Sequence, residues 1–478
     1  MAHEVEDPTP IALKVRGTST SAAEAIAAGS AEKMRATPSR SGRRRSRRGR
    51  RRDPRGFVMA VRSRRPATPR SFLAPIRADG ALYARLVRDP TTSRLAGFGT
   101  TIFARMSALA AETGAINLGQ GFPDTDGPTE VLDAAVAAIR GGQNQYPPGL
   151  GIADLRQAVA EHQQRFWGMT VDPDTEVLIT AGATEALAGS LLGILETGDE
   201  VIVFEPMFDS YQACIALAGA TVVPITLLPG VDGYTFDPEV LRAAVTPRTR
   251  LILLNTPHNP TGKVFTREEL LTIAEVALKH DLLVITDEVY EHLVFDDREH
   301  IPMATLPGMW ERTLTISSGG KTFSTTGWKI GWICGPQEIV RAAMRAKQFL
   351  TYVNGAPFQP AIATGLRLGD AYFTGLARRL QDARDALASG LGQAGFTVYP
   401  SEATYFTTVD ITPVRPDGDG MALCEQLPHL IGVVAVPNEV FYVDPARGRN
   451  LVRFACCKRP EVIDEAVERL GRLKEVLA

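Results

Sequence analysis

Short runs of β-branched and other apolar residues recur along the chain from about Leu95 onward, and segments with a helical spacing of apolar positions separate them. The runs expected to form strands are 176–180 (EVLIT), 200–204 (EVIVF), 250–255 (RLILLN), 282–287 (LLVITD) and 313–318 (TLTISS). Helices are expected between them, for example over 185–195 and 267–280, where Thr266 and Glu269 predict a capping box at the start of the second. Strands that alternate with helices predict an α/β fold with a largely parallel, helix-covered sheet.

The pattern changes after about Asp370, where long charged helices over 376–391 and 461–477 alternate with only a few strands. This change predicts a second, smaller α+β domain. We expect a large domain over 140–370. The small domain would combine 91–139 with 371–478 and close over a bound ligand.

Residues 1–90 differ in charge from the rest of the chain. They hold 21 Lys and Arg against 8 Asp and Glu, a net charge of +13, so the remaining residues carry −15 to give the total of −2. The segment 42–56 alone places nine arginines among fifteen residues. With few large apolar residues, such a segment is expected to be disordered. One interpretation is a basic arm for nucleic acid or another anionic surface. The alternatives are a non-essential extension, or a wrongly chosen upstream start codon with the true start at Met59 or later. An organelle transit peptide is a weaker option, because Glu4, Glu6 and Asp7 are acidic.

The five cysteines are scattered and form no CxxC motif. An odd, scattered set indicates a reducing compartment without a disulfide framework, so we expect a cytoplasmic protein. The pair Cys456-Cys457 is interpreted as buried structural thiols, with a redox switch as the alternative. The sequence suggests no convincing membrane span, no secretory signal and no metal site.

Polar and ionisable residues follow each predicted strand, which places them at one edge of one sheet. The segments concerned are 181–187 (AGATEAL), 205–211 (EPMFDSY), 255–264 (NTPHNPTGKV), 287–295 (DEVYEHLVF) and 317–332 (SSGGKTFSTTGWKIGW). In open α/β sheets ligands bind beyond the carboxyl ends of the strands. Five such segments on one rim therefore predict a binding site.

Three elements of this rim suggest specific chemistry. Gly182, Ala183 and Thr184 open a helix whose free N–H groups suit a phosphate, although Thr184 could instead be an ordinary N-cap. Asp287 ends an apolar strand, so its carboxylate is expected to be buried and to need a cation such as a protonated ring nitrogen. The alternative is an aspartate that only caps the next turn.

Lys321 lies among glycines at a strand end, beside the predicted phosphate pocket, and is placed to form a Schiff base with a carbonyl. Two other glycine-rich motifs fail here, because a Walker A motif would need glycine at Thr315 and a Rossmann fingerprint would need glycine at Asp124. Ser318-x-x-Lys321 matches the SxxK motif of penicillin-binding enzymes and remains a distant alternative, a serine hydrolase without a clear SDN or KTG companion.

Taken together, these motifs strongly resemble fold-type I, class I aminotransferases that depend on pyridoxal 5′-phosphate (PLP). The resemblance runs from about Leu95 to the C-terminus and includes a late VRFA at 452–455. The segments 116–124 (INLGQGFPD), 144–149 (NQYPPG), 255–262 (NTPHNPTG) and 286–296 (TDEVYEHLVFD) resemble the branch that holds N-succinyldiaminopimelate aminotransferases and kynurenine/glutamine transaminases. The resemblance implies a large domain with a mostly parallel seven-stranded sheet and a small α+β domain.

The resemblance also implies roles for the cofactor residues. Lys321 would hold PLP as a Schiff base and shuttle the proton, Asp287 would pair with the pyridinium nitrogen, and Tyr290 with Asn259 would bind the phenolic oxygen. Phe208 would lie against the ring, where aspartate-specific relatives have Trp. The phosphate would be held by Gly182, Ala183, Thr184, Ser318 and Lys329, with Lys329 standing where many relatives carry Arg.

The remaining implied roles concern the substrate and a second subunit. Arg453 would bind the substrate α-carboxylate as a bidentate pair, with Gly121 and Asn259 nearby. The alternative for Arg453 is a surface ion pair, but its apolar neighbours in 451–454 favour a buried position. Tyr146 would reach the phosphate of a neighbouring subunit, which implies a homodimer. Possible apolar walls of the substrate pocket are Phe98, Phe122, Tyr146, Phe208 and Phe441.

The predicted activity is transfer of an α-amino group between an L-amino acid and a 2-oxo acid, with glutamate and 2-oxoglutarate as one pair. N-succinyl-L,L-diaminopimelate is the first expected substrate by resemblance. A kynurenine, glutamine or methionine transaminase, or a cysteine-conjugate β-lyase, is the alternative. We expect no nucleic-acid partner apart from contacts of the basic arm.

Overall fold

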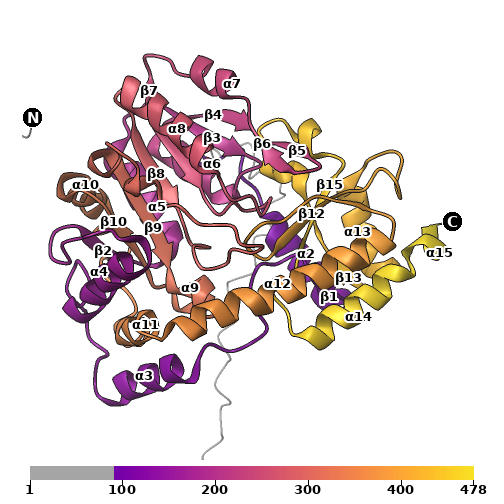
Figure 1. Cartoon of the computed structure of the whole chain (residues 1–478), viewed down its shortest axis with the longest axis horizontal. Coiled ribbons are helices and arrows are strands. Elements are labelled where there is room, and N and C mark those ends of the chain that lie inside the picture. The colour runs from indigo at the N-terminus through magenta and orange to yellow at the C-terminus, as the bar shows by residue number, and fades with distance from the viewer. Residues whose placement is uncertain (1–90, 478) are drawn as a thin grey trace, which may run out of the picture. The chain divides into compact units, whose positions relative to one another are not determined.

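The computed structural model describes residues 91–477, and Figure 1 shows how their helices and strands are arranged. The expectations for residues 1–90, including disorder and the basic arm, lie outside the described residues. Two groups of elements are built from this part of the chain, one around a seven-stranded sheet and one around a four-stranded sheet.

The larger sheet has the strand order β2-β10-β9-β8-β7-β3-β4, and all its strands run parallel except β10, which is antiparallel to both neighbours. Its strands are β2 (Val177–Thr180), β3 (Glu200–Glu205), β4 (Thr221–Thr226), β7 (Thr249–Asn255), β8 (Leu283–Asp287), β9 (Thr313–Ser318) and β10 (Gly331–Cys334). The five runs read as strands in the sequence are confirmed. The seven-stranded α/β architecture implied by the resemblance is confirmed as well.

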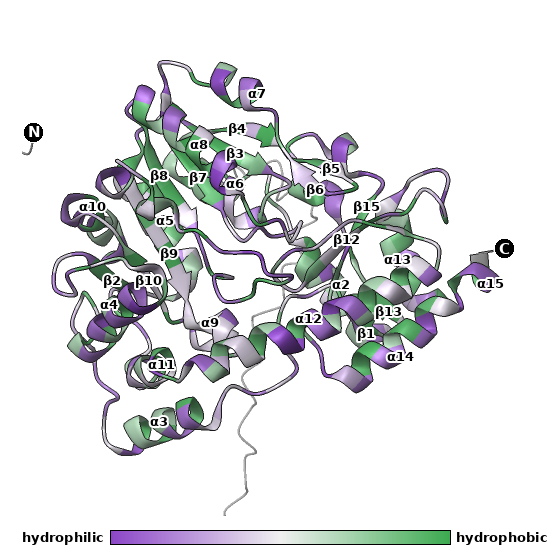
Figure 2. Cartoon of the chain, viewed as in Figure 1, coloured by the Kyte–Doolittle hydropathy of each residue, from purple (hydrophilic) through white to green (hydrophobic). Residues whose placement is uncertain are grey.

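Helices cover both faces of this sheet because its strands are apolar on both sides. Val201, Val203 and Leu253 point into one apolar cluster, and their neighbours Ile202 and Leu254 point into another on the opposite face. The sheet strands are accordingly mostly green in Figure 2. The surrounding helices are α3 (Thr129–Arg140), α4 (Ala153–Trp167), α5 (Gly182–Ile194), α6 (Asp209–Ala218), α7 (Pro238–Ala243), α8 (Arg267–Lys279), α10 (Gln337–Lys347) and α11 (Gln359–Leu366).

Helix α8 begins as the sequence predicts. The Thr266 hydroxyl accepts from the Glu269 N–H, and the Glu269 carboxylate accepts from the Thr266 N–H. Both bonds satisfy donors that a helix start otherwise leaves free, so the capping box is confirmed.

The smaller, antiparallel sheet has the order β11-β12-β15-β14. Its strands are β11 (Thr397–Val398), β12 (Phe406–Asp410), β14 (Val436–Pro437) and β15 (Leu451–Ala455). A parallel pair, β1 (Ile116–Asn117) with β13 (Val433–Val434), brings an early segment of the chain beside this group. The helices here are α2 (Ile102–Thr113), α12 (Asp370–Gln393), α13 (Gly420–Leu430), α14 (Pro460–Gly471) and α15 (Leu473–Leu477). The domain boundaries stay a prediction.

The remaining elements are short. They comprise the hairpin β5 (Leu228–Gly230) and β6 (Gly233–Thr235), helix α9 (Gly319–Thr322) and five 3-10 helices (Met303–Thr305, Trp310–Arg312, Thr326–Trp328, Asn438–Phe441 and Pro445–Gly448). All five cysteines are buried and unpaired. Within residues 91–477, no helix has the length and apolar character needed to cross a membrane.

Candidate functional site

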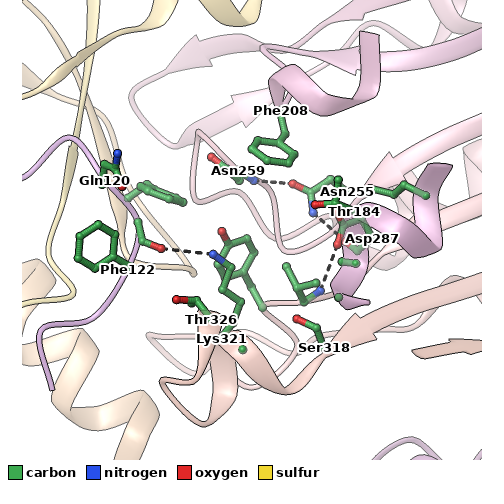
Figure 3. Close-up of a pocket in the computed structure, with 18 of the residues that line it drawn as sticks. Gln120, Phe122, Thr184, Phe208, Asn255, Asn259, Asp287, Ser318, Lys321 and Thr326 are labelled. Atoms are coloured by element: carbon green, nitrogen blue, oxygen red, sulfur yellow. Dashed lines mark hydrogen bonds between the residues drawn. The ribbon is translucent and has the colours of Figure 1, made fainter. Parts of the chain in front are cut away.

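One cavity of about 260 Å³ lies where the carboxyl ends of the parallel strands meet the small-sheet group. Figure 3 shows side chains from both groups pointing into it. Its walls include every residue predicted to bind the cofactor or the substrate α-carboxylate except Tyr146: Gly121, Gly182, Ala183, Thr184, Phe208, Asn259, Asp287, Tyr290, Ser318, Lys321, Lys329 and Arg453. The structure therefore brings together residues spread over more than three hundred positions of the sequence.

One end of the cavity is formed by the start of helix α5. Gly182 has a φ of +73°, a left-handed conformation that favours glycine, and it turns the chain from β2 into the helix. The helix has no side-chain N-cap, so Thr184 does not serve as one. The first N–H groups of a helix lack partners within it. With Ser318 and the exposed Lys329 beside them, they form a place for an anion.

Asp287 ends strand β8 and is 5% exposed. One carboxylate oxygen accepts a hydrogen bond of 2.8 Å from the Tyr211 phenol. The Asn255 side-chain amide donates a hydrogen bond of 2.7 Å to the backbone carbonyl of Asp287. Burial raises the pKa of Asp287 to about 6 even though the Tyr211 bond lowers it. No Lys, Arg or His among the described residues forms an ion pair with this carboxylate, so the site favours a cation that arrives with a ligand.

Lys321 extends from the short helix α9 into the cavity. Its ammonium donates to the Gly121 carbonyl at 3.3 Å, as the dashed line in Figure 3 shows. Burial lowers the pKa of Lys321 to about 8; Arg453 also lowers it, while Cys457 and Asp287 raise it. A lowered pKa increases the fraction of neutral amine, which is the nucleophilic form.

Arg453 lies in β15 and is 1% exposed, so it is no surface ion pair. Its guanidinium donates to the Asn259 side-chain oxygen and to the Gly119 carbonyl, both at 2.9 Å. It lies 4.0 Å from the Phe406 ring centroid, and its Nε has no partner. Burial lowers the pKa of Arg453 to about 10. A desolvated guanidinium without a carboxylate partner among the described residues is suited to an incoming carboxylate.

Aromatic side chains form the remaining walls. Tyr290 is 2% exposed, and burial raises the pKa of its phenol. Phe208 packs its ring against Tyr211 at a centroid distance of 5.8 Å. Of the other predicted walls, Phe122 lines the cavity, while Phe441 lies 5.0 Å from the Arg453 guanidinium and supports it from outside.

Besides Phe441, two predicted residues do not line this cavity. Phe98 is 40% exposed and Tyr146 is 82% exposed, and neither lines the cavity. The Tyr146 ring instead lies edge-on to Tyr352 at a centroid distance of 5.5 Å. Its predicted role in a neighbouring subunit is compatible with this exposure.

Sequence reasoning missed several residues of the site. Tyr211 stands three positions after Phe208 at the start of one helix, a spacing that could have identified it as a neighbour. Asn255 stands four positions before Asn259, and its side-chain oxygen accepts from the Asn259 N–H at 2.7 Å. Phe406 lies in a strand of the small sheet without a local signal.

Comparisons with known proteins agree with this arrangement. The family model described as aminotransferase class I and II matches residues 113–470. A "probable N-succinyldiaminopimelate aminotransferase" of Mycobacterium tuberculosis is 52% identical over 394 residues, covering 80% of this chain and 99% of that protein. A methionine aminotransferase of Escherichia coli is 38% identical over 381 residues, covering 80% and 98%.

Solved structures are similar over the same part of the chain. The N-succinyldiaminopimelate aminotransferase structure from Mycobacterium tuberculosis has a TM-score of 0.78 and 52% identity, covering 80% of this chain and all of that one. The aspartate aminotransferase of Thermus thermophilus with maleate has a TM-score of 0.74 and 33% identity, covering 81% of this chain and all of that one.

Proposed function

The chain belongs to the class I and II aminotransferases, and we propose that it transfers the amino group of N-succinyl-L,L-diaminopimelate, with glutamate and 2-oxoglutarate as the second pair. As a member of this family it uses PLP and acts on an amino acid and a 2-oxo acid. The 52% identity over 99% of the Mycobacterium tuberculosis relative supports this substrate. The family membership also leaves the SxxK hydrolase alternative without support.

The cavity residues fit PLP. The unpaired, buried Asp287 would hold the pyridinium nitrogen, and the start of α5 with Ser318 and Lys329 would hold the phosphate. Tyr290 and Asn259 would bind the phenolic oxygen, and Phe208 would cover the ring. PLP supplies, when bound, an electron sink for the electron pair left at the substrate Cα.

Lys321 is the residue that would carry the cofactor and move the proton. Its pKa of about 8 leaves part of the amine neutral near neutral pH, as attack on a carbonyl and removal of the Cα proton require. The Tyr290 and Tyr405 rings, whose centroids lie 5.8 and 5.7 Å from Nζ, flank this amine.

The observation that carries the proposed amino transfer is the position of Arg453. Its buried guanidinium has no carboxylate partner among the described residues and faces the same cavity as Lys321 and Asp287. It would bind the α-carboxylate and thereby orient the Cα–H bond of the substrate toward Lys321. Asn259 holds one edge of the guanidinium, so only part of its donors remain for the substrate.

A second candidate is transamination of kynurenine or methionine, or β-elimination from cysteine conjugates. The aromatic wall of Phe103, Phe122, Phe208 and Phe406 favours an apolar substrate side chain. Relatives of 38% identity include a methionine aminotransferase and a kynurenine–oxoglutarate transaminase of Dictyostelium discoideum.

The active protein is proposed to be a homodimer in the cytoplasm. Tyr146 lies against the exposed Tyr352 (56% exposed), and Phe349 (84% exposed) stands three positions before Tyr352 in the chain; a second copy would cover these exposed aromatic side chains. Tyr146 would then reach the partner's phosphate site. The buried, unpaired cysteines support a reducing compartment.

The test is amino transfer by the PLP-loaded protein with a panel of donors and acceptors, beside Lys321→Ala and the surface control Lys279→Ala. We expect N-succinyl-L,L-diaminopimelate to give the highest kcat/KM, Lys321→Ala to abolish transfer and Lys279→Ala to leave it unchanged. Faster transfer from kynurenine or methionine would favour the second candidate. Full activity of Lys321→Ala would refute both.

A further inference from the structure

Some side chains at the end of β8 and in the turn that follows face the cavity, and others point away from it into the protein interior. Asp287 and Tyr290 line the cavity. Glu288 and Glu291 do not line it and are 0% and 4% exposed. A buried carboxyl group is costly unless it is hydrogen-bonded or protonated, so the partners of Glu291 identify what it holds.

The Glu291 carboxyl group bridges two elements from behind the cavity. One oxygen accepts from the Ser317 hydroxyl at 2.5 Å, and the other accepts from the Trp167 indole N–H at 2.7 Å. Ser317 belongs to β9, four residues before Lys321, and Trp167 is the last residue of α4. Glu291 therefore connects the turn that carries Tyr290 to the strand end that leads into Lys321.

This bridge lies where the sheet no longer holds the two segments together. The register of β8 with β9 ends at Asp287 opposite Ile316, and the last backbone bond runs from the Glu288 N–H to the Ile316 carbonyl at 2.8 Å. Beyond it, the Ser317–Glu291 bond continues the connection through side chains.

A second contact fixes the same turn to α4. The Nε2 atoms of His162 and His292 are 2.7 Å apart, so one ring donates to the other. Burial lowers the pKa of His162 to about 3 and also lowers that of His292, so both rings are neutral. Phe166 and Phe373 pack against the pair.

The charges around Glu291 agree with a hydrogen-bonding role. Burial raises the pKa of Glu291 to about 7, with the Ser317 bond and His300 lowering it and Glu288 raising it. Glu288 and His300 form their own buried pair at 2.8 Å. Both oxygens of Glu291 accept hydrogen bonds, and the Nε2 atoms of His162 and His292 are bonded to each other, so these groups are already engaged without a metal ion.

We propose that Glu291 is a positioning residue for amino transfer, which holds the Asp287–Tyr290 turn in register with the strand end that carries Lys321. It acts through these groups and touches neither substrate nor cofactor. The inference rests on the proposed function, because the roles of Asp287, Tyr290 and Lys321 come from it.

The test compares Glu291→Ala with Glu291→Gln in the PLP-loaded full chain. Glutamine keeps both contacts, since its carbonyl can accept from Trp167 and its amide can donate to the Ser317 oxygen. We expect Glu291→Ala to lower kcat on the order of 10- to 100-fold with little change in KM, because small misplacements of reacting groups are costly. It should also shift the pH at which the absorption of Lys321-linked PLP changes. Glu291→Gln should restore kcat to within about threefold.

Controls separate positioning from loss of stability. Ser317→Ala removes one contact and should lower kcat in the same direction, which keeps the proposal testable if Glu291→Ala does not fold. Leu270→Ala, fully buried on α8 and away from this turn, provides a matched loss of stability and should leave kcat and the absorption unchanged.

Three results would overturn the proposal. They are unchanged kcat and absorption in Glu291→Ala and Ser317→Ala, an equal fall of kcat in Leu270→Ala, or a stoichiometric metal ion in the wild-type protein that Glu291→Ala loses. Failure of the proposed function itself would look different, because the wild-type protein would then neither bind PLP at Lys321 nor transfer amino groups.

Discussion

The phenol of Tyr211 donates a hydrogen bond of 2.8 Å to the carboxylate of Asp287, and both side chains are at most 5% exposed. Tyr211 belongs to α6 and Asp287 ends β8, so the bond joins these two elements at the wall of the cavity. It favours the charged carboxylate, while burial favours the neutral acid. The balance between these two effects determines how far Asp287 is ionised and therefore whether a negative charge is available to a protonated ring nitrogen of a ligand.

Tyr211→Phe is expected to raise the pKa of Asp287 further, because it removes a bond that lowers this pKa. A hydrogen bond to a charged group is worth about 1.5–3 kcal/mol, which corresponds to a shift of about one pH unit or more. The acidic limb of the kcat/KM profile should therefore move to higher pH. Tyr442→Phe, a buried tyrosine outside the cavity, is the control. Coincident profiles for Tyr211→Phe and wild type would contradict the prediction.

Asp287→Asn is expected to stabilise the PLP-free protein above pH 6 while abolishing amino transfer. The pKa of Asp287 is raised to about 6 in the folded chain and is near 3.9 when unfolded. Because the folded chain ionises this carboxyl less readily than the unfolded chain, the free energy of unfolding falls as pH rises from about 4 to 6. Above pH 6 the total loss is up to about 3 kcal/mol. Urea unfolding of wild type and Asp287→Asn at pH 4 and pH 8 measures the difference, and the higher free energy of unfolding of Asp287→Asn should appear only at pH 8.

Arg453→Lys is expected to lower kcat/KM for α-carboxylate substrates on the order of 100-fold, because lysine lacks the planar fork that binds a carboxylate at two points. It also cannot span the Asn259 and Gly119 acceptors in the same way. Arg449→Lys, at a partly exposed ion pair with Asp419, is the control. Steady-state kinetics with an amine that lacks the carboxylate should show a much smaller difference between wild type and Arg453→Lys.

Thr266→Ala is expected to lower the free energy of unfolding by about 0.5–2 kcal/mol without changing kcat. The change removes the hydroxyl that accepts from Glu269 at the start of α8, and this helix lies away from the cavity. Thr272→Ala, inside the same helix, should change stability by about 0.5 kcal/mol or less. Denaturant unfolding of the three proteins measures the difference, and equal losses would argue against the cap.

The sequence determined the features that depend on neighbours along the chain. Apolar runs predicted β2, β3, β7, β8 and β9, and the Thr266–Glu269 spacing predicted the capping box. Asp287 and Lys321 were found because Asp287 ends one strand and Lys321 comes shortly after the end of another, and strand ends in parallel sheets meet at one edge. The resemblance added the seven-stranded sheet and Arg453, which no local pattern would have connected to Lys321.

Only the tertiary structure decided which distant residues meet. Strand β10 runs antiparallel between β2 and β9. The sequence indicated only that its residues follow a glycine-rich segment of the site, and did not indicate the direction of the strand. Tyr211 reaches Asp287 across 76 positions, and Ser317 and Trp167 meet Glu291 across 26 and 124 positions. Such contacts depend on how helices and strands pack and on which polar groups must be satisfied once water is excluded, and these conditions exist only in the folded chain.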